Sequence, residues 1–490
     1  MGLAGKTTSG IVWTTVSAIV RSVVGLLQVS ILTRLLTKAD FGIVAIANIF
    51  IGFTHIFLDL GLSSGILHKQ GITSREYSSL FWLNVMMGAL LTAILCAITP
   101  LVARAYNEPS LIRILSLLSL TIFFYSFGSQ HRTVQQKQMQ FRTMALIEIF
   151  AALITISSAV FLALKGFGVY SLVYSTMINA FVTNIVYFIV GITRDHNIRF
   201  HFSFRETVPF LKIGVFSIGT QVLDYFSREI DVIIISATLG KDKLGVYSLC
   251  KKIVTSLYSL INPIITRILT PSLAIIQKNV EKVRSVYYSI VESLALVNFP
   301  IYFLVAIFSY AILFYLYGDQ YIDESVTLSL LAVYYGYLST GNPVGSLQIA
   351  MGRTDSGFYW TICRIILFAA AVWIGSFYQI EGIVVCLFVI SLLSSPLAWQ
   401  ITIRPLIGGH FLPFFKLSVK PLFVISVIAC PFYLFFKRIN SIPIVFLLSF
   451  LFLSCCFVLF MVLFKENRFV QMLKSRLLTL RTEKNHVPRQ

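Results

Sequence analysis

Long apolar stretches, one after another, constrain this chain more than any other feature of its sequence. A transmembrane helix needs about 20 mostly apolar residues, and about fourteen such segments follow one another with short polar connections. Charged residues interrupt the apolar pattern in the seventh and eighth segments. The predicted spans are residues 11–35, 40–64, 79–103, 111–130, 144–164, 168–192, 209–238, 243–269, 285–316, 325–350, 357–378, 380–403, 417–437 and 442–464.

The composition requires an apolar surrounding for the same chain. Of its 490 residues, 57% are hydrophobic and 12% are charged, and a soluble domain would carry about twice that charged fraction. The surplus of apolar side chains is too large for one water-soluble core. We therefore expect an all-α polytopic membrane protein with about fourteen transmembrane helices and almost nothing outside the bilayer.

Short basic clusters between the apolar segments predict the orientation of the chain. The net charge of +19 is spread over these clusters and forms no single patch, so we do not expect nucleic-acid binding. Cytoplasmic loops carry an excess of Lys and Arg, and a cytoplasmic N-terminus places the main clusters on that side. We expect a bacterial inner-membrane protein with both termini in the cytoplasm and a basic cytoplasmic tail at residues 465–490. The main clusters are Lys69/Arg75, Arg132/Lys137/Arg142, Arg194/Arg199/Arg205 and Lys278/Lys282/Arg284.

An internal repeat divides the apolar segments into two halves. Residues 35–44 (LLTKADFGIV) resemble residues 238–247 (TLGKDKLGVY), and two shorter matches follow in the same order. Both members of each pair follow an odd number of spans, so the halves are parallel repeats, as in transporters with two lobes around a central cavity. We predict a six-helix lobe at residues 1–195, a second at 209–403, and two further transmembrane helices at 417–464.

Polar and ionised residues recur on one face of four predicted spans. In the first span they stand three or four residues apart, as one face of a helix requires, and the second, seventh and eighth spans repeat this pattern. An ionised side chain at mid-membrane costs about 2.5–3.5 kcal/mol, so we expect these faces to line a wet cavity between the lobes. The candidate substrate-binding residues are Arg21, Gln28, Asn48, His55, Asp59, Asp224, Arg228, Asp231, Lys251, Lys252 and Arg364.

Structural pairing is the alternative for several of these groups. Arg228 is placed to pair with Asp224 or Asp231 on the same helix and so to hold helices together. Pairing explains three single ionisable residues as well as function does, namely Arg364, Glu148 and Glu292. No local partner is obvious for Arg21, Lys251 and Lys252.

Motifs for enzymatic chemistry are absent from the sequence. It contains no P-loop or other nucleotide signature, no metal-binding cluster and no nucleophile motif, and its loops are too short for an enzyme domain. We therefore expect no enzyme activity and no cofactor. Cations left over in the cavity suit an anionic substrate group such as phosphate or pyrophosphate.

Five short motifs indicate a family. They are Gly10–Trp13 (GIVW), residues 35–42 (LLTKADFG), Asp59–Leu62 (DLGL), Gln135–Arg142 (QQKQMQFR) and Gly166–Tyr170 (GFGVY). With these motifs the chain resembles the polysaccharide-transporter family of the multidrug/oligosaccharidyl-lipid/polysaccharide exporter superfamily, and in particular the Wzx-type flippases of the colanic-acid and lipopolysaccharide exporter group. The resemblance covers the first half of the chain and, more loosely, the second.

The resemblance implies a mechanism and a set of binding residues. It implies two six-helix bundles that work by alternating access and flip an undecaprenyl-pyrophosphate-linked oligosaccharide to the periplasmic leaflet. Arg21 matches an arginine that related lipid-II flippases use in the first helix, and Lys251 or Lys252 matches a basic residue in the eighth. The second span carries His55 and Asp59 where those relatives have an arginine.

The last two spans lie outside the repeat, and the resemblance implies that they form a groove for the polyprenyl tail of the substrate. The candidate groove residues are Phe423, Phe432, Phe435 and Phe446. A proton or sodium gradient is the expected driving force, and the candidate coupling carboxylates are Asp59, Asp224, Asp231 and Glu292. Membrane lipids and polysaccharide polymerase or assembly proteins are the other expected partners.

Two other functions stay open at this point. A drug or small-cation antiporter of the same superfamily would depend on the carboxylates and not on the cations. A non-transporting scaffold of a polysaccharide assembly complex would depend on its surface loops and on neither group of charges.

Overall fold

The protein is described from a computed structural model that covers residues 3–69, 71–194, 198, 200–353, 355–436, 438–439, 441–464, 467 and 471. Every regular element in that part of the chain is helical. The chain forms two compact units, unit 1 (Met1–Leu249) and unit 2 (Cys250–Gln490). The predicted basic tail at 465–490 lies outside the described residues, apart from residues 467 and 471.

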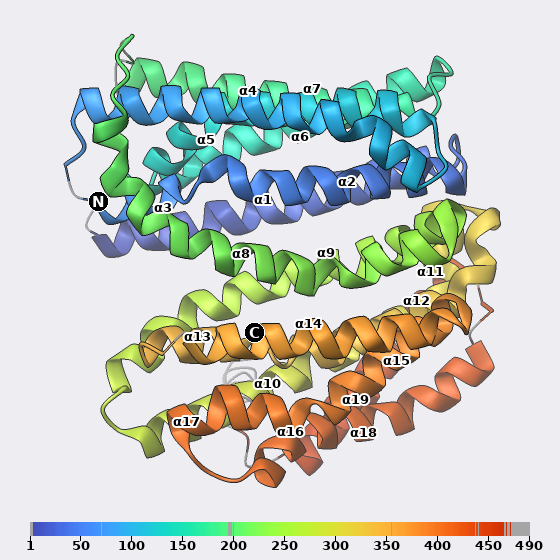
Figure 1. The fold of residues 1–490 in the computed structure, drawn as a ribbon. Helices are drawn as coiled ribbons and strands as arrows, with labels where there is room; N and C mark the ends of the chain where they lie inside the picture. The colour runs from blue at the N-terminus through green and yellow to red at the C-terminus, as the bar shows by residue number, and fades with distance from the viewer. Residues whose placement is uncertain are drawn as a thin grey trace, which may run out of the picture. The chain divides into compact units, whose positions relative to one another are not determined.

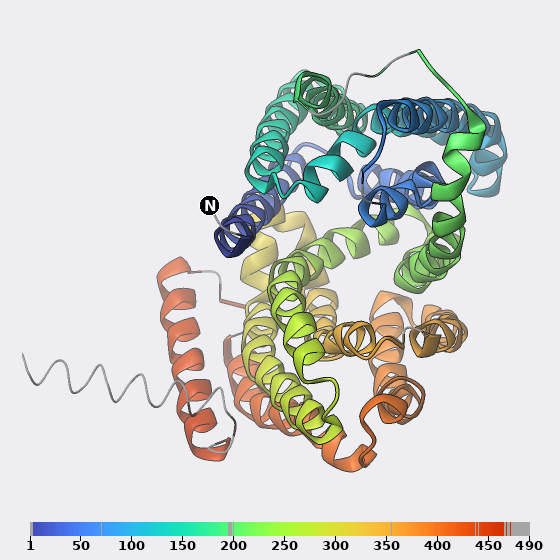
Figure 2. The same ribbon diagram turned by 90° about the vertical axis from the view of Figure 1, so that its left-hand side faces the viewer.

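Unit 1 is a bundle of long helices that run side by side (Figure 1). Figure 2 shows the same bundle along its helix axes. α1 packs along α6, α4 packs along α5, and α7 packs against both α5 and α6. The helices are α1 (Leu3–Leu32), α2 (Lys38–Asp59), α3 (Leu62–His68), α4 (Ser74–Ala105), α5 (Ser110–Lys137), α6 (Phe141–Leu164), α7 (Tyr170–Arg194), α8 (Phe204–Thr238) and the start of α9 (Gly240–Ile276).

Capping residues determine where two of these helices begin. The Thr37 hydroxyl accepts a hydrogen bond from the main-chain N–H of Asp40 at 3.3 Å, and the Asp40 carboxylate accepts one from the N–H of Thr37 at 2.9 Å. Thr73 and Glu76 form the same reciprocal pair at the start of α4. Such capping boxes satisfy N–H groups that have no partner inside the helix. They fix the first turns of α2 and α4.

α8 belongs to unit 1 because it packs against α2, α3 and α4. The Tyr225 hydroxyl on α8 donates to the main-chain oxygen of Ile49 on α2 at 2.6 Å. The Tyr225 ring lies against Gly52, where a Cβ would come within 2.9 Å of it. Nearer the start of α8, Phe210 is buried against Ile66 of α3. The division between the units therefore falls after α8, whereas the second predicted lobe begins before it; the lobe boundaries stay a prediction.

Two repeat-related glycines bring α2 and α9 into direct main-chain contact. A Cβ on Gly42 would overlap the main-chain oxygen of Lys241, and a Cβ on Gly245 would overlap the main-chain oxygen of Lys38. In the internal repeat, Gly42 matches Gly245 and Lys38 matches Lys241. The contact is therefore reciprocal, since the glycine of each motif packs on the lysine of the other. Only glycine allows main chains to approach so closely.

An ion pair joins the turn between α4 and α5 to the start of α9. Lys241 pairs with Glu108 of that turn, and the Ser110 hydroxyl donates to the Glu108 carboxylate at 2.9 Å. The hydrogen bond from Lys241 lowers the pKa of Glu108, and the same bond raises the pKa of Lys241. The hydroxyls of Tyr106 and Ser236 lie 3.1 Å apart and join this turn to the end of α8.

Unit 2 contains the rest of α9 and the helices that follow it. A 3₁₀ turn at Asp319–Glu324 precedes α12, and a π-helical turn at Trp399–Ile403 joins α16 to α17. The helices are α10 (Val280–Ile307), α11 (Ser309–Tyr317), α12 (Ser325–Ser339), α13 (Pro343–Ala350), α14 (Asp355–Ser376), α15 (Gln379–Leu393), α16 (Ser395–Ala398), α17 (Arg404–Ile407), α18 (Phe411–Phe436) and α19 (Ile442–Leu463).

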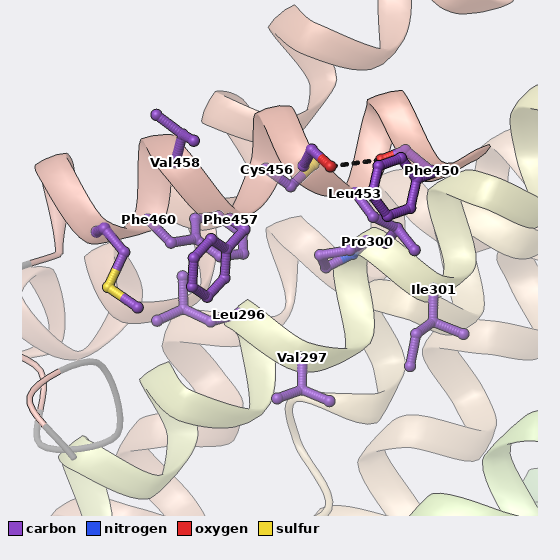
Figure 3. A pocket seen from close by; sticks show the side chains of 12 residues that line it. Leu296, Val297, Pro300, Ile301, Phe450, Leu453, Cys456, Phe457, Val458 and Phe460 are labelled. Atoms are coloured by element: carbon purple, nitrogen blue, oxygen red, sulfur yellow. Dashed lines mark hydrogen bonds between the residues drawn. The ribbon is translucent and has the colours of Figure 1, made fainter. Parts of the chain in front are cut away.

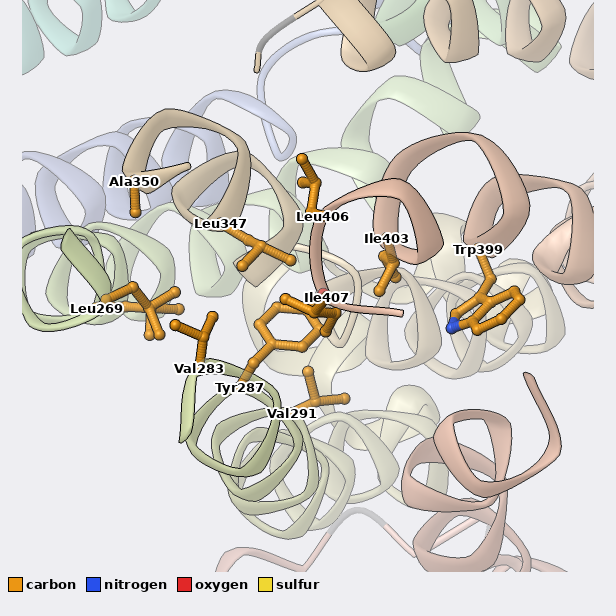
Figure 4. Close-up of a cluster of buried hydrophobic side chains, with 11 residues drawn as sticks. Leu269, Val283, Tyr287, Val291, Leu347, Ala350, Trp399, Ile403, Leu406 and Ile407 are labelled. Carbon is orange, nitrogen blue, oxygen red and sulfur yellow. The ribbon is translucent and has the colours of Figure 1, made fainter. Parts of the chain in front are cut away.

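One face of α10 forms a buried core in unit 2 (Figure 4). Val283, Tyr287 and Val291 recur every four residues, so they lie on the same side of the helix, and all three are fully buried. They pack against Leu347 of α13 and Ile407 of α17. This core holds the two short helices against the long one.

The described part of the chain has ten helices long and apolar enough to cross a membrane. There are eleven if α15 and the segment Ser395–Ile407, which is bent from it by 46°, count as one span. The protein is thus an all-helical, multi-pass membrane protein, with fewer such helices than the fourteen predicted spans. Charged residues lower the hydropathy of α8 and α9, and the predicted span 325–350 is divided into α12 and α13, each too short to cross alone.

Candidate functional site

The carboxylate of Glu148 on α6 lies where four helices of unit 1 meet. Its Oε2 accepts a hydrogen bond from the Ser17 hydroxyl at 3.0 Å and pairs with Arg21 Nη2 at 3.4 Å, both from α1. Its Oε1 pairs with Arg132 Nη2 of α5 at 3.2 Å and accepts from the Tyr187 hydroxyl of α7 at 3.5 Å. We call these five residues the Glu148 cluster.

Helix geometry and close packing bring α1 to this carboxylate. Ser17 and Arg21 stand four residues apart, so both lie on the same face of α1. That face packs along α6. Gly10 permits the approach near the start of α1, because a Cβ there would lie 2.5 Å from the Phe141 ring of α6. The position of Glu148 on α6 then sets the point at which the two donors meet it.

The Glu148 cluster holds one positive charge in excess, because a single carboxylate serves two guanidinium groups. The side chains of Arg21 and Arg132 are 46% and 53% exposed, whereas that of Glu148 is 13% exposed. Each guanidinium has five N–H donors, and Glu148 is reached through Nη2 of each arginine. An unbalanced charge within a membrane costs about 2.5–3.5 kcal/mol. The exposed side of the arginine pair therefore suits water or an anion.

Arg21 does not face the side of α1 that suits lipid. Val16, Ile19, Val23 and Leu27 are exposed apolar side chains on α1, and at about 3.6 residues per turn they lie on one side of the helix. Arg21 projects from the opposite side, together with the rest of the polar face. The polar face predicted for the first span is thus separate from its exposed apolar face.

The structure gives Arg21 a partner that its local sequence did not indicate. The expectation that Arg21 has no obvious local partner holds along α1, but Glu148 reaches it from α6. Glu148 was one of the single ionisable residues for which pairing and function were equal alternatives. It now has four donors around it, so it pairs, and its pairing organises the two arginines.

Sequence reasoning missed Arg132. It placed Arg132 in a cytoplasmic loop, because the apolar run of the fourth span ends at residue 130. The helix continues as α5 to Lys137, and Arg132 therefore lies on a helix beside Glu148. A signal was available, since residues 131–137 contain no Gly or Pro to end the helix.

The other predicted residues on α1 and α2 of unit 1 have different surroundings. Gln28 lies on the same face of α1 as Arg21, and its Nε2 is 3.5 Å from the Ser175 hydroxyl of α7. His55 on α2 meets the Tyr125 ring of α5 edge to face, with 4.4 Å between the ring centroids. Asn48 is exposed on α2. A substrate-binding role for these residues stays a prediction.

Asp59 has a local role at the end of α2. Its Oδ1 accepts from the Ser63 hydroxyl at 2.5 Å and from the Ser63 N–H at 3.2 Å. Leu60 and Gly61 between them have positive φ angles of 45° and 69°. The carboxylate therefore caps the first turn of α3 and stabilises the sharp turn before it.

The three predicted residues on α8 separate into one buried and two exposed side chains. Asp231 is buried, and its carboxylate accepts from the Tyr247 hydroxyl of α9 at 2.5 Å and from the Val232 N–H at 2.8 Å. Arg228 Nε donates to the main-chain oxygen of Asp224 at 3.3 Å, and both side chains are exposed. Asp231 thus joins α8 to α9, and the carboxylate of Asp224 is accessible.

The remaining predicted cations belong to unit 2. On α9, Lys251 is half-buried and Lys252 is exposed. On α14, the Arg364 guanidinium lies 5.0 Å from the centroid of the Phe368 ring, a cation–π contact. Because these residues and Arg21 are in different units, a shared site stays a prediction.

Glu292 of α10 has a partner just beyond α19. The Asn467 side-chain amide donates to the Glu292 carboxylate at 2.6 Å, and the Ser293 hydroxyl donates to the Asn467 side-chain oxygen at 3.1 Å. Asn467 is buried. These bonds hold the Asn467 side chain against α10, which is a structural role for Glu292.

An apolar groove of about 500 Å³ lies between α10 and α19 in unit 2 (Figure 3). The single hydroxyl in its lining, that of Ser454, donates to the main-chain oxygen of Phe450 at 2.8 Å, so the groove offers apolar surface. The lining residues are Leu296, Val297, Pro300, Ile301, Phe450, Leu453, Ser454, Cys456, Phe457, Val458, Phe460 and Met461. None of the four predicted groove residues is among them. Phe423, Phe435 and Phe446 are exposed, and Phe432 packs against buried side chains of α10, α18 and α19.

Comparison with known proteins gives relatives along most of the chain. Residues 31–326 match the family described as polysaccharide biosynthesis protein. The lipopolysaccharide biosynthesis protein WzxC of Escherichia coli is 26% identical over 416 residues, which cover 84% of each chain. The teichuronic acid biosynthesis protein TuaB of Bacillus subtilis is 27% identical over 389 residues, which cover 79% of this chain and 80% of TuaB.

A solved structure shows a similar fold. The lipid II flippase MurJ in its inward closed conformation matches with a TM-score of 0.75 and 14% sequence identity. The match covers 93% of this chain and 99% of that one.

Among the described residues, no group of three or more His, Cys, Asp and Glu side chains could hold a metal ion.

Proposed function

The chain belongs to the polysaccharide biosynthesis protein family as a Wzx-like exporter, and on that premise we propose that it flips an undecaprenyl-pyrophosphate-linked oligosaccharide across the bacterial inner membrane. It is a membrane transporter of that family and not an enzyme. Its relatives WzxC and TuaB are named for the biosynthesis of lipopolysaccharide and teichuronic acid, and MurJ is named a lipid II flippase. These names support a lipid-linked oligosaccharide as the substrate.

The observation that carries this proposal is the position of Arg21 in the Glu148 cluster. Arg21 is 46% exposed and lies on the polar face of α1, where the cluster has one positive charge in excess. A pyrophosphate headgroup supplies the anion that such a site suits, because guanidinium groups bind phosphate oxygens through paired hydrogen bonds. Arg228, an exposed side chain on α8 of the same unit, is a further candidate for binding the headgroup.

The groove between α10 and α19 is the proposed site for the polyprenyl tail of the substrate. A polyprenyl chain is wholly apolar, and burial of apolar surface stabilises binding by about 25 cal/mol per Å². A groove lined by apolar side chains from α10 and α19 fits such a chain. We therefore assign the tail to this groove in place of the four phenylalanines named from the sequence.

The proposal includes fourteen passes through the membrane, with both termini in the cytoplasm. At about 1.5 Å per residue, α8 with 35 residues and α9 with 37 residues are each long enough to cross. Polar residues on their faces lower their hydropathy, as expected for helices that line a wet cavity. α12 and α13 together make the remaining pass. Polysaccharide polymerase and assembly proteins are the proposed partners.

Alternating access is proposed to draw on a proton or sodium gradient. Of the four candidate carboxylates, Asp59 caps α3, Asp231 binds Tyr247, and Glu292 binds Asn467. Asp224 is the exposed one, and we assign it the coupling role. Asp224→Asn should then stop transport in a protein that folds and inserts normally.

A deletion strain tests the proposed function. The wild-type chain should restore surface polysaccharide, and Arg21→Ala should fail to do so while lipid-linked repeat units accumulate inside the cell. Immunoblotting of the membrane fraction controls for insertion. Full rescue by Arg21→Ala would overturn the headgroup assignment and would favour an antiporter or a scaffold, neither of which needs that cation.

A further inference from the structure

We propose that Arg21 and Arg132 bind the pyrophosphate of the lipid carrier together, and that Glu148 positions both guanidinium groups for it. This inference deepens the proposed function and rests on it. It adds a second ligand from α5 and a positioning residue from α6, and neither was assigned from the sequence.

The contacts of Glu148 show that one small anion can reach both arginines. Its two carboxylate oxygens are the two ends of a planar anion, and Arg21 contacts one at 3.4 Å while Arg132 contacts the other at 3.2 Å. The guanidinium groups come from different helices, α1 and α5, and converge on this point. Their exposed sides remain open to a second anion, since about half of each side chain is accessible.

The chemistry of the pair favours a pyrophosphate over a monophosphate. A guanidinium binds one phosphoryl group through two parallel hydrogen bonds, so two guanidinium groups match two linked phosphoryl groups. A monophosphate offers a single phosphoryl group for the pair. The arginine pair should therefore select carriers by their second phosphate.

Glu148 is needed because the two arginines repel each other. In an environment of low dielectric, like charges a few ångströms apart repel strongly, and without a carboxylate between them the side chains would separate. The Ser17 hydroxyl and the Tyr187 hydroxyl hold the carboxylate from two further sides. Glu148 is also the least exposed member of the ion pairs, so it supports the pair from behind and leaves the accessible side to the substrate.

The depth of the cluster fits the leaflet in which a lipid-linked oligosaccharide would be loaded. Arg132 lies five residues before the end of α5, and Glu148 lies seven residues after the start of α6. At about 1.5 Å per residue, both are within about 10 Å of the turn that joins these helices. That turn is cytoplasmic in the predicted orientation, so the cluster is placed for a headgroup that arrives from the cytoplasmic leaflet.

Binding of defined lipids to the purified full-length protein in lipid nanodiscs tests the inference. The probes are geranylgeranyl pyrophosphate, geranylgeranyl monophosphate and geranylgeraniol, and the readout is the dissociation constant of each. Arg132→Gln should weaken pyrophosphate binding about tenfold or more, as expected for loss of a charge-assisted contact, and change monophosphate binding by less than about threefold. Arg132→Lys keeps the charge without the paired donors and should fall between the wild type and Arg132→Gln.

Arg113→Gln is the matched control. Arg113 lies on α5 as Arg132 does, is exposed, and is near the opposite end of that helix, so its loss should leave the binding of all three probes unchanged. If Arg132→Gln and Arg113→Gln bind pyrophosphate equally well, the arginine pair is not the site, and the proposed function is unaffected. If the wild type binds pyrophosphate no better than geranylgeraniol, the proposed lipid-pyrophosphate substrate itself is wrong.

The positioning role of Glu148 needs its own readout. Glu148→Gln should weaken pyrophosphate binding about tenfold in the wild-type background, and it should have no further effect on binding in the Arg21→Gln/Arg132→Gln background, where nothing is left to position. A merely structural role predicts the same loss in both backgrounds, together with a lowered melting temperature, and that result would overturn the assignment. Glu148→Asp keeps the charge and should recover part of the binding.

Discussion

Replacing Gly42 by alanine should force α2 away from α9. Besides overlapping the main-chain oxygen of Lys241, a Cβ at this position would lie 2.6 Å from its carbonyl carbon. Carbon atoms in contact lie about 3.5–4.0 Å apart, so the main chains must separate by at least about 1 Å. The neighbouring group is main chain, and no side-chain rotation can make room. Overpacking of this kind costs about 1–3 kcal/mol.

The reciprocal glycine makes the prediction sharper. Gly245→Ala would bring a Cβ to 3.1 Å from the carbonyl carbon of Lys38, besides overlapping its oxygen. One separation of α2 from α9 makes room for both methyl groups, so the double variant should lose about as much stability as Gly42→Ala alone. Residues that share one contact are expected to be non-additive in this way. Melting temperatures of the purified variants in lipid nanodiscs measure the effect.

Gly219→Ala supplies the matched control for both substitutions. Gly219 lies on α8 with no atom within 4 Å of the position that a Cβ would take, so alanine there should stabilise the helix by about 1 kcal/mol. The reasoning is refuted if Gly42→Ala is as stable as Gly219→Ala. It is refuted equally if the losses from Gly42→Ala and Gly245→Ala add in full.

The ion pair of Glu108 and Lys241 should be detectable in the pH dependence of stability. Because the pair is partly exposed, it contributes about 0.2–1 kcal/mol to the free energy of unfolding. Its contribution is complete between the ordinary pKa values of 4.5 and 10.5, is lost as the pH falls through the lowered pKa of Glu108, and is lost as the pH rises through the raised pKa of Lys241. The difference in melting temperature between the wild type and Glu108→Gln should therefore disappear at both extremes of pH; a constant difference would contradict this. Val297→Trp should fill part of the groove between α10 and α19 and weaken long-chain polyprenyl pyrophosphate several-fold more than a short-chain one, whereas Val389→Trp on the exposed side of α15 should affect neither. Asp59→Ala should lower the free energy of unfolding by about 0.5–2 kcal/mol, because α3 loses its cap. Asp59→Asn should keep most of the wild-type stability, since asparagine also caps helices. If Asp59→Asn is stable but cannot transport, Asp59 is again a candidate coupling carboxylate.

The apolar pattern predicted most of the helices in unit 1, because helix length in a membrane is set by bilayer thickness. The predicted span 144–164 corresponds to α6, and 168–192 corresponds to α7. The pattern failed at 40–64, where it read α2 and α3 as one segment. The turn between them has left-handed conformations at Leu60 and Gly61, and apolar periodicity does not detect such a turn.

The candidate site was harder to predict, since its geometry depends on contacts between distant parts of the chain. Arg21 was identified as a candidate because an ionised residue inside an apolar run is conspicuous. Its partnership with Glu148 joins α1 to α6, and no local spacing encodes such a pairing. Arg132 escaped notice for a different reason: hydropathy marks where apolar residues end, whereas hydrogen bonding carries the α5 helix on to Lys137.

The reciprocal packing of Gly42 and Gly245 has the geometry of an isologous interface inside one polypeptide. In a symmetric homodimer the same patch is used twice, so a substitution at one position is felt at two places. Here the two copies are encoded separately, and each can change without the other. Once a larger residue in one motif has separated α2 from α9, the glycine of the other motif is no longer required for close packing. The two positions are therefore expected to change together, although nearly half the chain separates them.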